Sequence, residues 1–365
     1  MEKIRLGTVF SGIGAIEESL LKNDINHEIV FACDNGEIEL KDSKEMICKK
    51  IKNLNKSEKE KYVNKLYEET GKRNYIKDAY FANYKISEDK WFSDIRFLDG
   101  NKYKNKVDLF VGGSPCQSFS IIGKRKGLED ARGTLFFEYA RLVKEIEPKV
   151  FIYENVSGML SHDNGNTWSI IENIFKSLDY EIYFDVLNSV DYGIPQRRKR
   201  LFVIGFKNKD INFRFPIRVG LNKTLFDFLE NEPVATRHYL GKKGFEFVTN
   251  PKYKNRARVN NDVIQTEKAN QQFNWNGDFV FIPLKKAVLT DEIKKRAYIG
   301  EWNNEKGIIR QLTYRECMRL MGFDDSFKIV VPNVPAYREA GNSIVVNVFD
   351  NILKSIIETG VFKDE

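Results

Sequence analysis

The sequence predicts an α/β protein with a mostly parallel, Rossmann-like sheet and a smaller, β-rich second domain. Short apolar runs at residues 107–111, 150–153 and 201–205 have the pattern of buried parallel strands, and amphipathic stretches alternate with them. The chain also begins with a strand, a glycine turn and a helix. Between residues 208 and 307 the alternation stops. We therefore expect a first domain at 1–207 with a helical insertion at about 37–90, a second domain at 208–307, and a return to the first domain at 308–365.

Composition limits the class of protein. The chain has 365 residues, 42% of them hydrophobic, and a net charge of +7, which admits a polyanionic partner but indicates it only weakly. It has neither an apolar run of about 18 residues nor a signal-peptide core, so a cytoplasmic protein without a membrane span is expected. Four scattered cysteines and three histidines indicate neither a disulfide framework nor a metal site.

The N-terminal segment has the features of a nucleotide-like cofactor site. Residues 4–10 read as a strand, and Ser11-Gly12-Ile13-Gly14-Ala15 leads into a helix, which places backbone N–H groups around a ligand. Asp34 ends the second expected strand, 20 residues after Gly14, at the spacing where an acid can bind ribose hydroxyls. Asp34 as a helix N-cap is the alternative.

Residues 37–90 are rich in Lys and Glu, with scattered apolar positions, and predict helices with solvated charged faces. Such an insertion either has no chemistry or forms a basic surface that touches nucleic acid. The ordered pattern resumes at Trp91-Phe92-Ser93-Asp94-Ile95.

The run Gly112-Gly113-Ser114-Pro115-Cys116 places a thiol just beyond the carboxyl end of a buried strand. Pro115 cannot donate to a strand ladder and biases Ser114 toward an extended conformation, so the chain must leave the sheet here. Open α/β sheets bind ligands at this edge. A buried, inert cysteine is the general alternative, but the Gly-Gly-x-Pro approach favours a reactive thiol.

Two later segments should reach the same edge. Glu154 follows the strand at 150–153, which we expect to lie parallel to the cysteine strand, so its carboxylate should project into the same cleft. The basic run Gln196-Arg197-Arg198-Lys199-Arg200 precedes the strand at 201–205, so at least one of its cations should face a site, although a solvated strand edge is the alternative.

Three further segments complete the pattern. Residues 121–133 join three glycines to four basic side chains, which suits either a hinged phosphate-binding loop or a solvated one, and Thr134 should cap the helix that ends at Pro148. The run Asn255-Arg256-Ala257-Arg258 suits contacts with bases, although an ordinary β-rich domain fits almost as well. Helices are expected at 313–321 and 344–357, with Gly341-Asn342-Ser343 as the turn that leads into the second.

In this order, these segments resemble the DNA (cytosine-5) methyltransferase family over nearly the whole chain outside 37–90 and 208–307. The matching blocks are Phe10-Ser11-Gly12-Ile13-Gly14, Pro115-Cys116-Gln117, Glu154-Asn155-Val156, Gln196-Arg197-Arg198-Lys199-Arg200, Arg310-Gln311-Leu312-Thr313-Tyr314-Arg315-Glu316-Cys317 and Gly341-Asn342-Ser343. The agreement of many separate blocks makes the resemblance specific. It implies that 1–207 and 308–365 form the catalytic and cofactor-binding domain and that 208–307 is a target-recognition domain.

The resemblance implies S-adenosylmethionine as cofactor, with Asp34 on its ribose and Asp94 and Ile95 on its adenine. The other implied cofactor residues are Phe10, Gly12, Gly14, Asn35, Pro115, Leu135, Asn342 and Ile344. It also implies that Cys116 attacks carbon-6 of a cytosine flipped out of double-stranded DNA, while Glu154 contacts ring nitrogen 3 and the amino group and Arg200 holds the carbonyl oxygen. Arg198 and Gln117 complete the implied catalytic set. Implied DNA contacts are Ser118, Lys124, Arg125, Arg132, Arg256 and Arg258.

The sequence departs from the family at three places. Asn35 stands where many relatives have an aromatic residue that stacks on adenine, and 60 residues separate Asp34 from Asp94, more than relatives commonly have. Ile122 stands near the position where some relatives fill the space left by the flipped base.

The preferred function is methylation of a short specific site in duplex DNA by a monomer in the cytoplasm of a bacterial or phage-infected cell, with any restriction endonuclease acting separately. A tRNA cytosine-5 methyltransferase is the alternative, although the Cys-Phe-Thr tripeptide of that branch is missing. A nucleic-acid-binding protein without activity is a third possibility, against which the presence of Cys116, Glu154 and Arg200 argues.

Overall fold

The computed structural model describes residues 3–115, 135–271 and 275–363. The chain packs as two compact units. The first contains Met1–Leu187, Lys199–Ile217 and Phe349–Glu365, and the second contains Asn188–Arg198 and Arg218–Val348. Residues 188–198 and 308–348, which we placed in the catalytic domain, therefore pack with the second unit. Among the described residues, no helix is long and apolar enough to cross a membrane, and no cluster of His, Cys, Asp and Glu is arranged to hold a metal ion.

The first unit is built on a seven-stranded sheet with the order β3-β2-β1-β4-β5-β8-β6. Strands β3, β2, β1, β4 and β5 run parallel, and β8 pairs antiparallel with β5. The central strands β1, β4 and β5 are apolar and almost entirely buried, as the short apolar runs predicted. The strands are β1 Ile4–Val9, β2 His27–Cys33, β3 Trp91–Phe92, β4 Leu109–Gly112, β5 Val150–Val156, β6 Glu181–Asn188 and β8 Lys199–Phe206.

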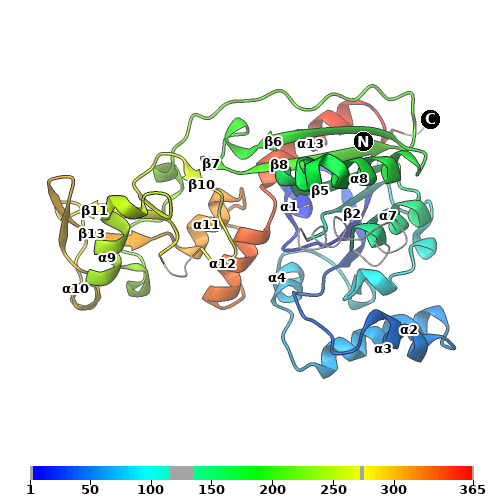
Figure 1. Ribbon diagram of the computed structural model, residues 1–365, viewed down its shortest axis with the longest axis horizontal. Coiled ribbons are helices and arrows are strands. Elements are labelled where there is room, and N and C mark those ends of the chain that lie inside the picture. Colours follow the sequence, from blue (N-terminus) through cyan, green and yellow to red (C-terminus); the bar gives the residue numbers. More distant parts are fainter. Residues whose placement is uncertain (1–2, 116–134, 272–274, 364–365) are drawn as a thin grey trace. The chain divides into compact units, whose positions relative to one another are not determined.

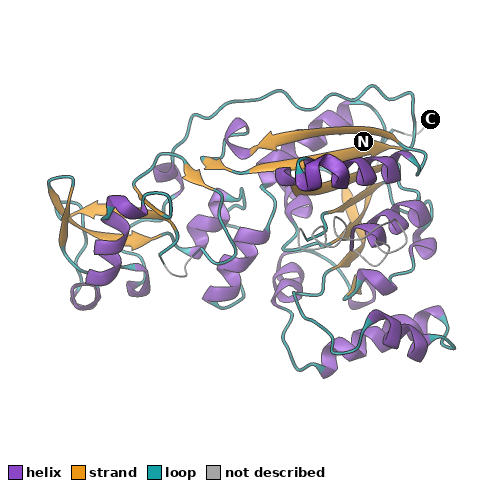
Figure 2. Ribbon diagram, viewed as in Figure 1, coloured by secondary structure: helices purple, strands orange, loops and turns teal. Residues whose placement is uncertain are grey.

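Helices α1 (Ala15–Lys22), α7 (Leu135–Ile146), α8 (Asn166–Lys176) and α13 (Val346–Glu358) accompany this sheet (Figure 2). The core is strongly aromatic: the rings of Phe110 and Tyr139 stack at 5.1 Å, and those of Phe151 and Phe175 stack at 5.0 Å. This packing joins α7 and α8 to the strands that carry the candidate catalytic residues.

The insertion at 37–90 folds into helices α2 (Lys44–Ile51), α3 (Lys56–Glu69) and α4 (Tyr75–Asn83), which confirms the predicted helices. Ser43, Asn55 and Asn74 cap them by accepting hydrogen bonds from backbone N–H groups. Helices α2 and α3 lie side by side (Figure 1) and share a small apolar cluster of their own. Its buried members are Ile38, Ile47, Ile51, Val63 and Tyr67.

The second unit has a four-stranded sheet with the order β12-β13-β11-β9 and a two-stranded pair, β10 with β7. This confirms the smaller β-rich part of the expected fold. Its strands are β7 Gln196–Arg197, β9 Ala257–Val259, β10 Ile264–Gln265, β11 Gly277–Pro283, β12 Gly300–Trp302 and β13 Glu305–Gln311. Its helices are α9 Lys242–Thr249, α10 Asp291–Arg296, α11 Tyr314–Leu320 and α12 Asn333–Asn342.

Helix α12 was not predicted, and the assignment of Gly341-Asn342-Ser343 as the turn into the last helix was incomplete. Asn342 is the last residue of α12, and Ser343 is its C-cap. Pro335 obscured this helix in the sequence, but it lies in the first turn, where a missing N–H costs nothing. The expected cap Thr134 lies outside the described residues.

Candidate active site

The turn after β1 has positive φ angles, which few residues other than glycine adopt. Phe10, Gly12 and Gly14 have φ values of 52°, 53° and 81°, and Gly14 is the N-cap of α1. A Cβ at Gly14 would lie 2.2 Å from the Tyr84 ring, so only glycine fits there. The Tyr84 hydroxyl donates to the carbonyl oxygens of Ile13 and Gly14 at 3.1 and 2.8 Å. Sequence and packing together therefore fix this turn at the N-terminus of a helix.

Asp34 lies at the carboxyl end of β2 and faces the turn. Its two carboxylate oxygens accept hydrogen bonds from the backbone N–H groups of Gly12 at 2.9 Å and Gly36 at 2.8 Å. Burial raises the pKa of Asp34, and these hydrogen bonds oppose the rise. No helix begins at Asp34, so its interpretation as a helix N-cap was wrong. Asn35 bonds the local backbone instead: its amide donates to the Ile38 carbonyl at 3.1 Å.

Asp94 and Ile95 follow β3, at the same edge of the sheet. Both are buried, and Asp94 caps the short 3-10 helix η2 (Ile95–Phe97). The Asp94 carboxylate pairs with Arg96 at 2.6 Å and accepts a hydrogen bond from the Tyr67 hydroxyl at 2.9 Å. The backbone of Asp34 donates to the Phe92 carbonyl at 3.0 Å, which ties the ends of β2 and β3 together.

The chain leaves β4 directly beside Glu154. A Cβ at Gly113 would lie 2.6 Å from the Glu154 carbonyl oxygen and 2.9 Å from its carboxylate, so glycine is required for this approach. Buried Ser114 is held by the Tyr153 hydroxyl at 2.7 Å and by the Asn155 amide, which donates to the Ser114 carbonyl at 2.8 Å. Pro115 is exposed. Gly113 thus explains how the segment before Cys116 can approach β5.

Glu154 and Arg200 form an ion pair, which the sequence did not predict. They lie on the antiparallel strands β5 and β8, and the Arg200 Nε is 3.1 Å from Glu154 Oε1. Both side chains are mostly buried, with 18% of Arg200 and 13% of Glu154 exposed. A carboxylate and a guanidinium that remain partly accessible can exchange their mutual contact for contacts with a ligand.

Arg198, Asn342 and Ile344 belong to the second unit. The guanidinium of buried Arg198 donates to the carbonyl oxygens of Glu267, Gly341 and Ser343, at 3.0, 3.0 and 2.6 Å. These contacts hold the segment that carries Asn342, which is exposed, and Ile344, which is half-buried. A direct catalytic role for Arg198 stays a prediction.

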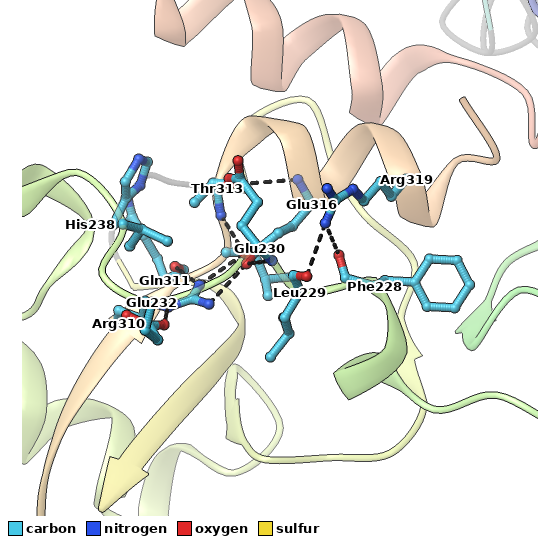
Figure 3. Close-up of polar contacts among 12 residues, drawn as sticks. Phe228, Leu229, Glu230, Glu232, His238, Arg310, Gln311, Thr313, Glu316 and Arg319 are labelled. Atoms are coloured by element: carbon cyan, nitrogen blue, oxygen red, sulfur yellow. Dashed lines mark hydrogen bonds and ion pairs between the residues drawn. The ribbon is translucent and has the colours of Figure 1, made fainter. Parts of the chain in front are cut away.

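The run 310–317 forms a buried polar network in the second unit (Figure 3). The guanidinium of Arg310, whose side chain is fully buried, makes two hydrogen bonds of 2.8 Å to the Glu316 carboxylate and pairs with Glu232 at 2.5 Å. Thr313 and Glu316 form a capping box at the start of α11, and Glu316 also accepts from the Glu230 backbone at 2.8 Å. The motif thus connects the loop that carries Glu230 and Glu232 with strand β13 and helix α11.

The two arginines predicted to contact bases differ in their surroundings. Arg256 is exposed, with its guanidinium 5.4 Å from the centre of the Phe247 ring and its Nε 3.2 Å from Asn276 Oδ1. Arg258 is half-buried and pairs with buried Asp278 at 3.2 Å. Leu135 begins α7 and packs against the core. The remaining predicted site residues, Cys116, Gln117, Ser118, Lys124, Arg125 and Arg132, lie outside the described residues.

The profile of the C-5 cytosine-specific DNA methylase family matches residues 5–358. This chain belongs to that family. The methylase is therefore a DNA (cytosine-5-)-methyltransferase, as the sequence motifs predicted.

Curated relatives agree with this assignment. The type II methyltransferase M.HhaI of Haemophilus parahaemolyticus is 37% identical over 270 residues, which cover 70% of the methylase and 77% of the relative. M.NgoBI of Neisseria gonorrhoeae is 33% identical and covers 76% of the methylase and 81% of the relative. The orphan methyltransferase M.SPRI of Bacillus phage SPR is 27% identical, with both chains covered completely.

Solved structures support the fold. The Entamoeba histolytica methyltransferase EhMeth matches with a TM-score of 0.68 at 15% identity, covering 98% of the methylase and 99% of that chain. The S. pombe Dnmt2 methyltransferase matches with a TM-score of 0.66 at 18% identity, covering 98% and 99%. At these identities the similarity concerns the fold alone.

Some residues around the site were not found from the sequence. Tyr67, Asn74 and Tyr84 reach the residues of the expected cofactor site from within the insertion; the Asn74 amide, for example, donates to the Asp34 carbonyl at 3.1 Å. Aromatic and amide residues in a Lys- and Glu-rich stretch carry no motif, so only the packing reveals them. The sequence placed Ser114 in a loop and Tyr153 in a strand, but it did not predict the hydrogen bond between them.

Proposed function

We propose that the methylase transfers a methyl group from S-adenosylmethionine to carbon-5 of a flipped cytosine within a short specific sequence of double-stranded DNA, through a covalent Cys116 adduct at carbon-6. The observation that supports this most directly is the Glu154–Arg200 pair, which lies beside Gly113 in the segment that precedes Cys116. It supplies an acid and a cation where the chemistry needs them.

The residues around Asp34 fit the cofactor. A ligand with a ribose meets an acid at the end of β2, a left-handed glycine turn at the start of α1, and the buried Asp94–Ile95 segment after β3. Asp34 would bind the ribose hydroxyls, since each carboxylate oxygen has a lone pair beyond the one used for Gly12 or Gly36. Asp94 and Ile95 would hold the adenine, and Phe10 and Leu135 would line the site. When bound, the cofactor supplies an activated methyl group.

The chemistry explains the choice of catalytic residues. Carbon-5 of cytosine is a poor nucleophile, so the Cys116 sulfur first bonds to carbon-6 and makes the ring enamine-like. Glu154 contacts ring nitrogen 3 and the amino group, and Arg200 the carbonyl oxygen, so that negative charge developing on the ring meets fixed partners. The pairing of Glu154 with Arg200 holds both groups in position until the base replaces their mutual contact. After methyl transfer, loss of the carbon-5 proton breaks the carbon–sulfur bond and releases Cys116.

Recognition of the DNA sequence belongs, in this proposal, to residues of the second unit. Exposed Arg256 lies over Phe247, whose ring stacks on Tyr253 at 4.2 Å and lies 5.3 Å from Trp275. A guanidinium held against aromatic rings is preorganised for bidentate contact with a guanine edge. Arg258 would first have to leave Asp278, which makes Arg256 the stronger candidate.

We also propose that the methylase acts as a monomer in the cytoplasm of a bacterial or phage-infected cell, and that any restriction endonuclease acts separately. Curated relatives include both type II and orphan phage methyltransferases, so a paired endonuclease is not required by the family.

The covalent adduct provides the decisive test. Duplex DNA carrying 5-fluorocytosine at the target should trap the wild-type enzyme with S-adenosylmethionine, because the fluorine at carbon-5 cannot leave as a proton does. Cys116→Ala should form no adduct and lose methyl transfer, while its Kd for S-adenosylmethionine stays within about twofold of wild type. Adducts are measured by denaturing gel electrophoresis. Cys48→Ser is the matched control, since Cys48 is an exposed thiol and should be dispensable. A trapped adduct with Cys116→Ala would contradict the assignment.

Two further experiments identify the class of nucleic acid that is methylated and the DNA sequence that is recognised. Transfer of labelled methyl groups to duplex DNA but not to tRNA is expected, and labelling of tRNA alone would support the alternative function. Bisulfite sequencing of a plasmid methylated by the enzyme identifies the recognised sequence.

A further inference from the structure

The hairpin of helices α2 and α3 contacts the residues assigned to the adenine of the cofactor. The hydroxyl of buried Tyr67, on α3, donates to Asp94 Oδ2 at 2.9 Å, and the Arg96 guanidinium pairs with the same oxygen. Asp94 Oδ1 accepts from the Arg96 backbone N–H at 3.0 Å and from the Arg96 Nε at 2.9 Å. Burial, and next the Asp94 charge, raise the pKa of the Tyr67 phenol, so it stays protonated and acts as a donor at neutral pH. A carboxylate held from two directions by Tyr67 and Arg96 has little freedom to rotate.

A second connection runs from α2 through α7 to the backbone of Ile95 and Leu98. Lys44, in the first turn of α2, pairs with buried Glu138 on α7. Glu138 also pairs with Arg141 at 2.8 Å, and the Arg141 guanidinium donates to the carbonyl oxygens of Ile95 at 2.9 Å and Leu98 at 3.0 Å. This chain of ion pairs links α2, the start of α7 and η2.

Apolar packing makes the third connection. Phe97, the last residue of η2, packs against the apolar cluster of the hairpin, whereas Ile95, two residues earlier, belongs to the core beneath the sheet. The 3-10 helix η2 therefore lies between the hairpin and the sheet, with Asp94 at its N-cap. An insertion that only covered surface, or only presented charge to DNA, would not need a buried tyrosine directed at this carboxylate.

We propose that the α2–α3 hairpin is a brace for the adenine subsite, in which Tyr67 is a positioning residue: it holds Asp94 Oδ2, so that Oδ1 can accept from the 6-amino group of adenine in place of the Arg96 Nε. This inference rests on the proposed function, because it presumes that the Asp94–Ile95 segment binds the adenine. A carboxylate with a fixed direction accepts from an amino group and repels a carbonyl oxygen, so the brace gives both affinity and discrimination for the base.

The test uses binding to the full-length enzyme rather than turnover. Tyr67→Phe keeps the buried ring and removes only the hydroxyl. Isothermal titration should show S-adenosylhomocysteine binding roughly five- to tenfold more weakly to Tyr67→Phe than to wild type. S-inosylhomocysteine, which has a carbonyl oxygen in place of the amino group, should bind both proteins about equally, so the preference for adenine shrinks. Tyr62→Phe, the same change on the same helix at a partly buried position of the same cluster, is the control and should leave both affinities unchanged.

The outcomes separate the brace from the proposed function. If wild type does not bind S-adenosylhomocysteine, the cofactor assignment fails, and the brace fails with it. If wild type binds and Tyr67→Phe binds equally well, or loses affinity for both ligands in the same proportion, only the brace is wrong. Should Tyr67→Phe not fold, Lys44→Gln at a partly exposed position tests the second connection. It should weaken S-adenosylhomocysteine binding roughly two- to threefold, and unchanged binding would overturn the proposal.

Discussion

Glu154 and Arg200 illustrate how single residues were predictable. Glu154 follows a buried apolar run, so its position at the sheet edge followed from the sequence. Arg200 begins such a run, and its 3.1 Å contact with Glu154 follows from the antiparallel pairing of β5 and β8. The sequence predicted a parallel neighbour for the cysteine strand, but it did not predict that β8 would run in the opposite direction. This reversal brings Arg200 opposite Val156, two residues beyond Glu154.

Glu17 is a buried acid whose titration should affect stability. It lies in the first turn of α1, and its carboxylate accepts hydrogen bonds from the hydroxyls of Tyr80 and Thr8. Burial raises its pKa from 4.5 to about 7. The folded protein therefore holds this proton more tightly than the unfolded chain, and the free energy of unfolding falls as the pH rises from 4.5 to about 7, then stays level.

Glu17→Gln should remove this pH dependence. Between pH 5 and pH 8 the wild type should lose about 2.5 kcal/mol more unfolding free energy than Glu17→Gln, as measured by urea denaturation at both pH values. Glu267, whose pKa burial raises to about 8, titrates in both proteins and cancels in this difference. Parallel pH profiles for the two proteins would show that Glu17 does not titrate as proposed.

At the scale of elements, the run 310–317 acts as a clasp within the second unit. It connects β13, the N-terminus of α11 and the loop that carries Glu230 and Glu232 (Figure 3). The sequence identified the run as a family motif, but the clasp depends on Glu232, some 80 residues earlier in the chain, which no local pattern connects to Arg310.

Arg310→Ala should strongly destabilise the second unit. The substitution leaves the carboxylate of fully buried Glu316 without its cation, which costs about 3–5 kcal/mol because an uncompensated buried charge is expensive. Thermal or urea denaturation measures the loss. Lys285→Ala in the same unit is the control, because its ion pair with Glu305 is largely exposed and should contribute little. Equal losses for the two variants would mean that burial of Arg310 is not what makes the clasp important.

Elements were predictable where local pattern decides them. The buried strands were expected from short apolar runs, and the helices of the insertion from Lys- and Glu-rich stretches with scattered apolar positions; the structure contains both. Helix α12 was missed because its prolines suggested a loop. Tyr67 was missed for a different reason: its contact with Asp94 is set by tertiary packing of the hairpin, and a tyrosine in a charged helix is ordinarily a core residue.

At the scale of the whole molecule, the chain crosses between two units several times. It leaves the first unit after Leu187, returns at Lys199, leaves again after Ile217 and returns at Phe349. The Glu154–Arg200 pair and the Asp34 turn lie in the first unit, and Arg256 lies in the second. The net charge of +7 favours DNA binding in general, but it carries no sequence information. Catalysis and sequence choice should therefore be separable by substitution.

Arg256→Ala should reduce discrimination between the target duplex and duplexes with one altered base pair, while leaving the methylation rate at saturating DNA within about threefold of wild type. A bidentate arginine contact contributes about 1–3 kcal/mol of discrimination, so the ratio of kcat/KM values for the two duplexes should fall roughly fivefold to a hundredfold. Arg296→Ala, an exposed arginine of the same unit, is the matched control for the loss of one positive charge. It should weaken binding to both duplexes equally and reduce the salt dependence of binding, without changing the ratio. An unchanged ratio in Arg256→Ala would remove this residue from the set that reads bases and would turn attention to Arg258, whose pairing with Asp278 would then have to break on binding.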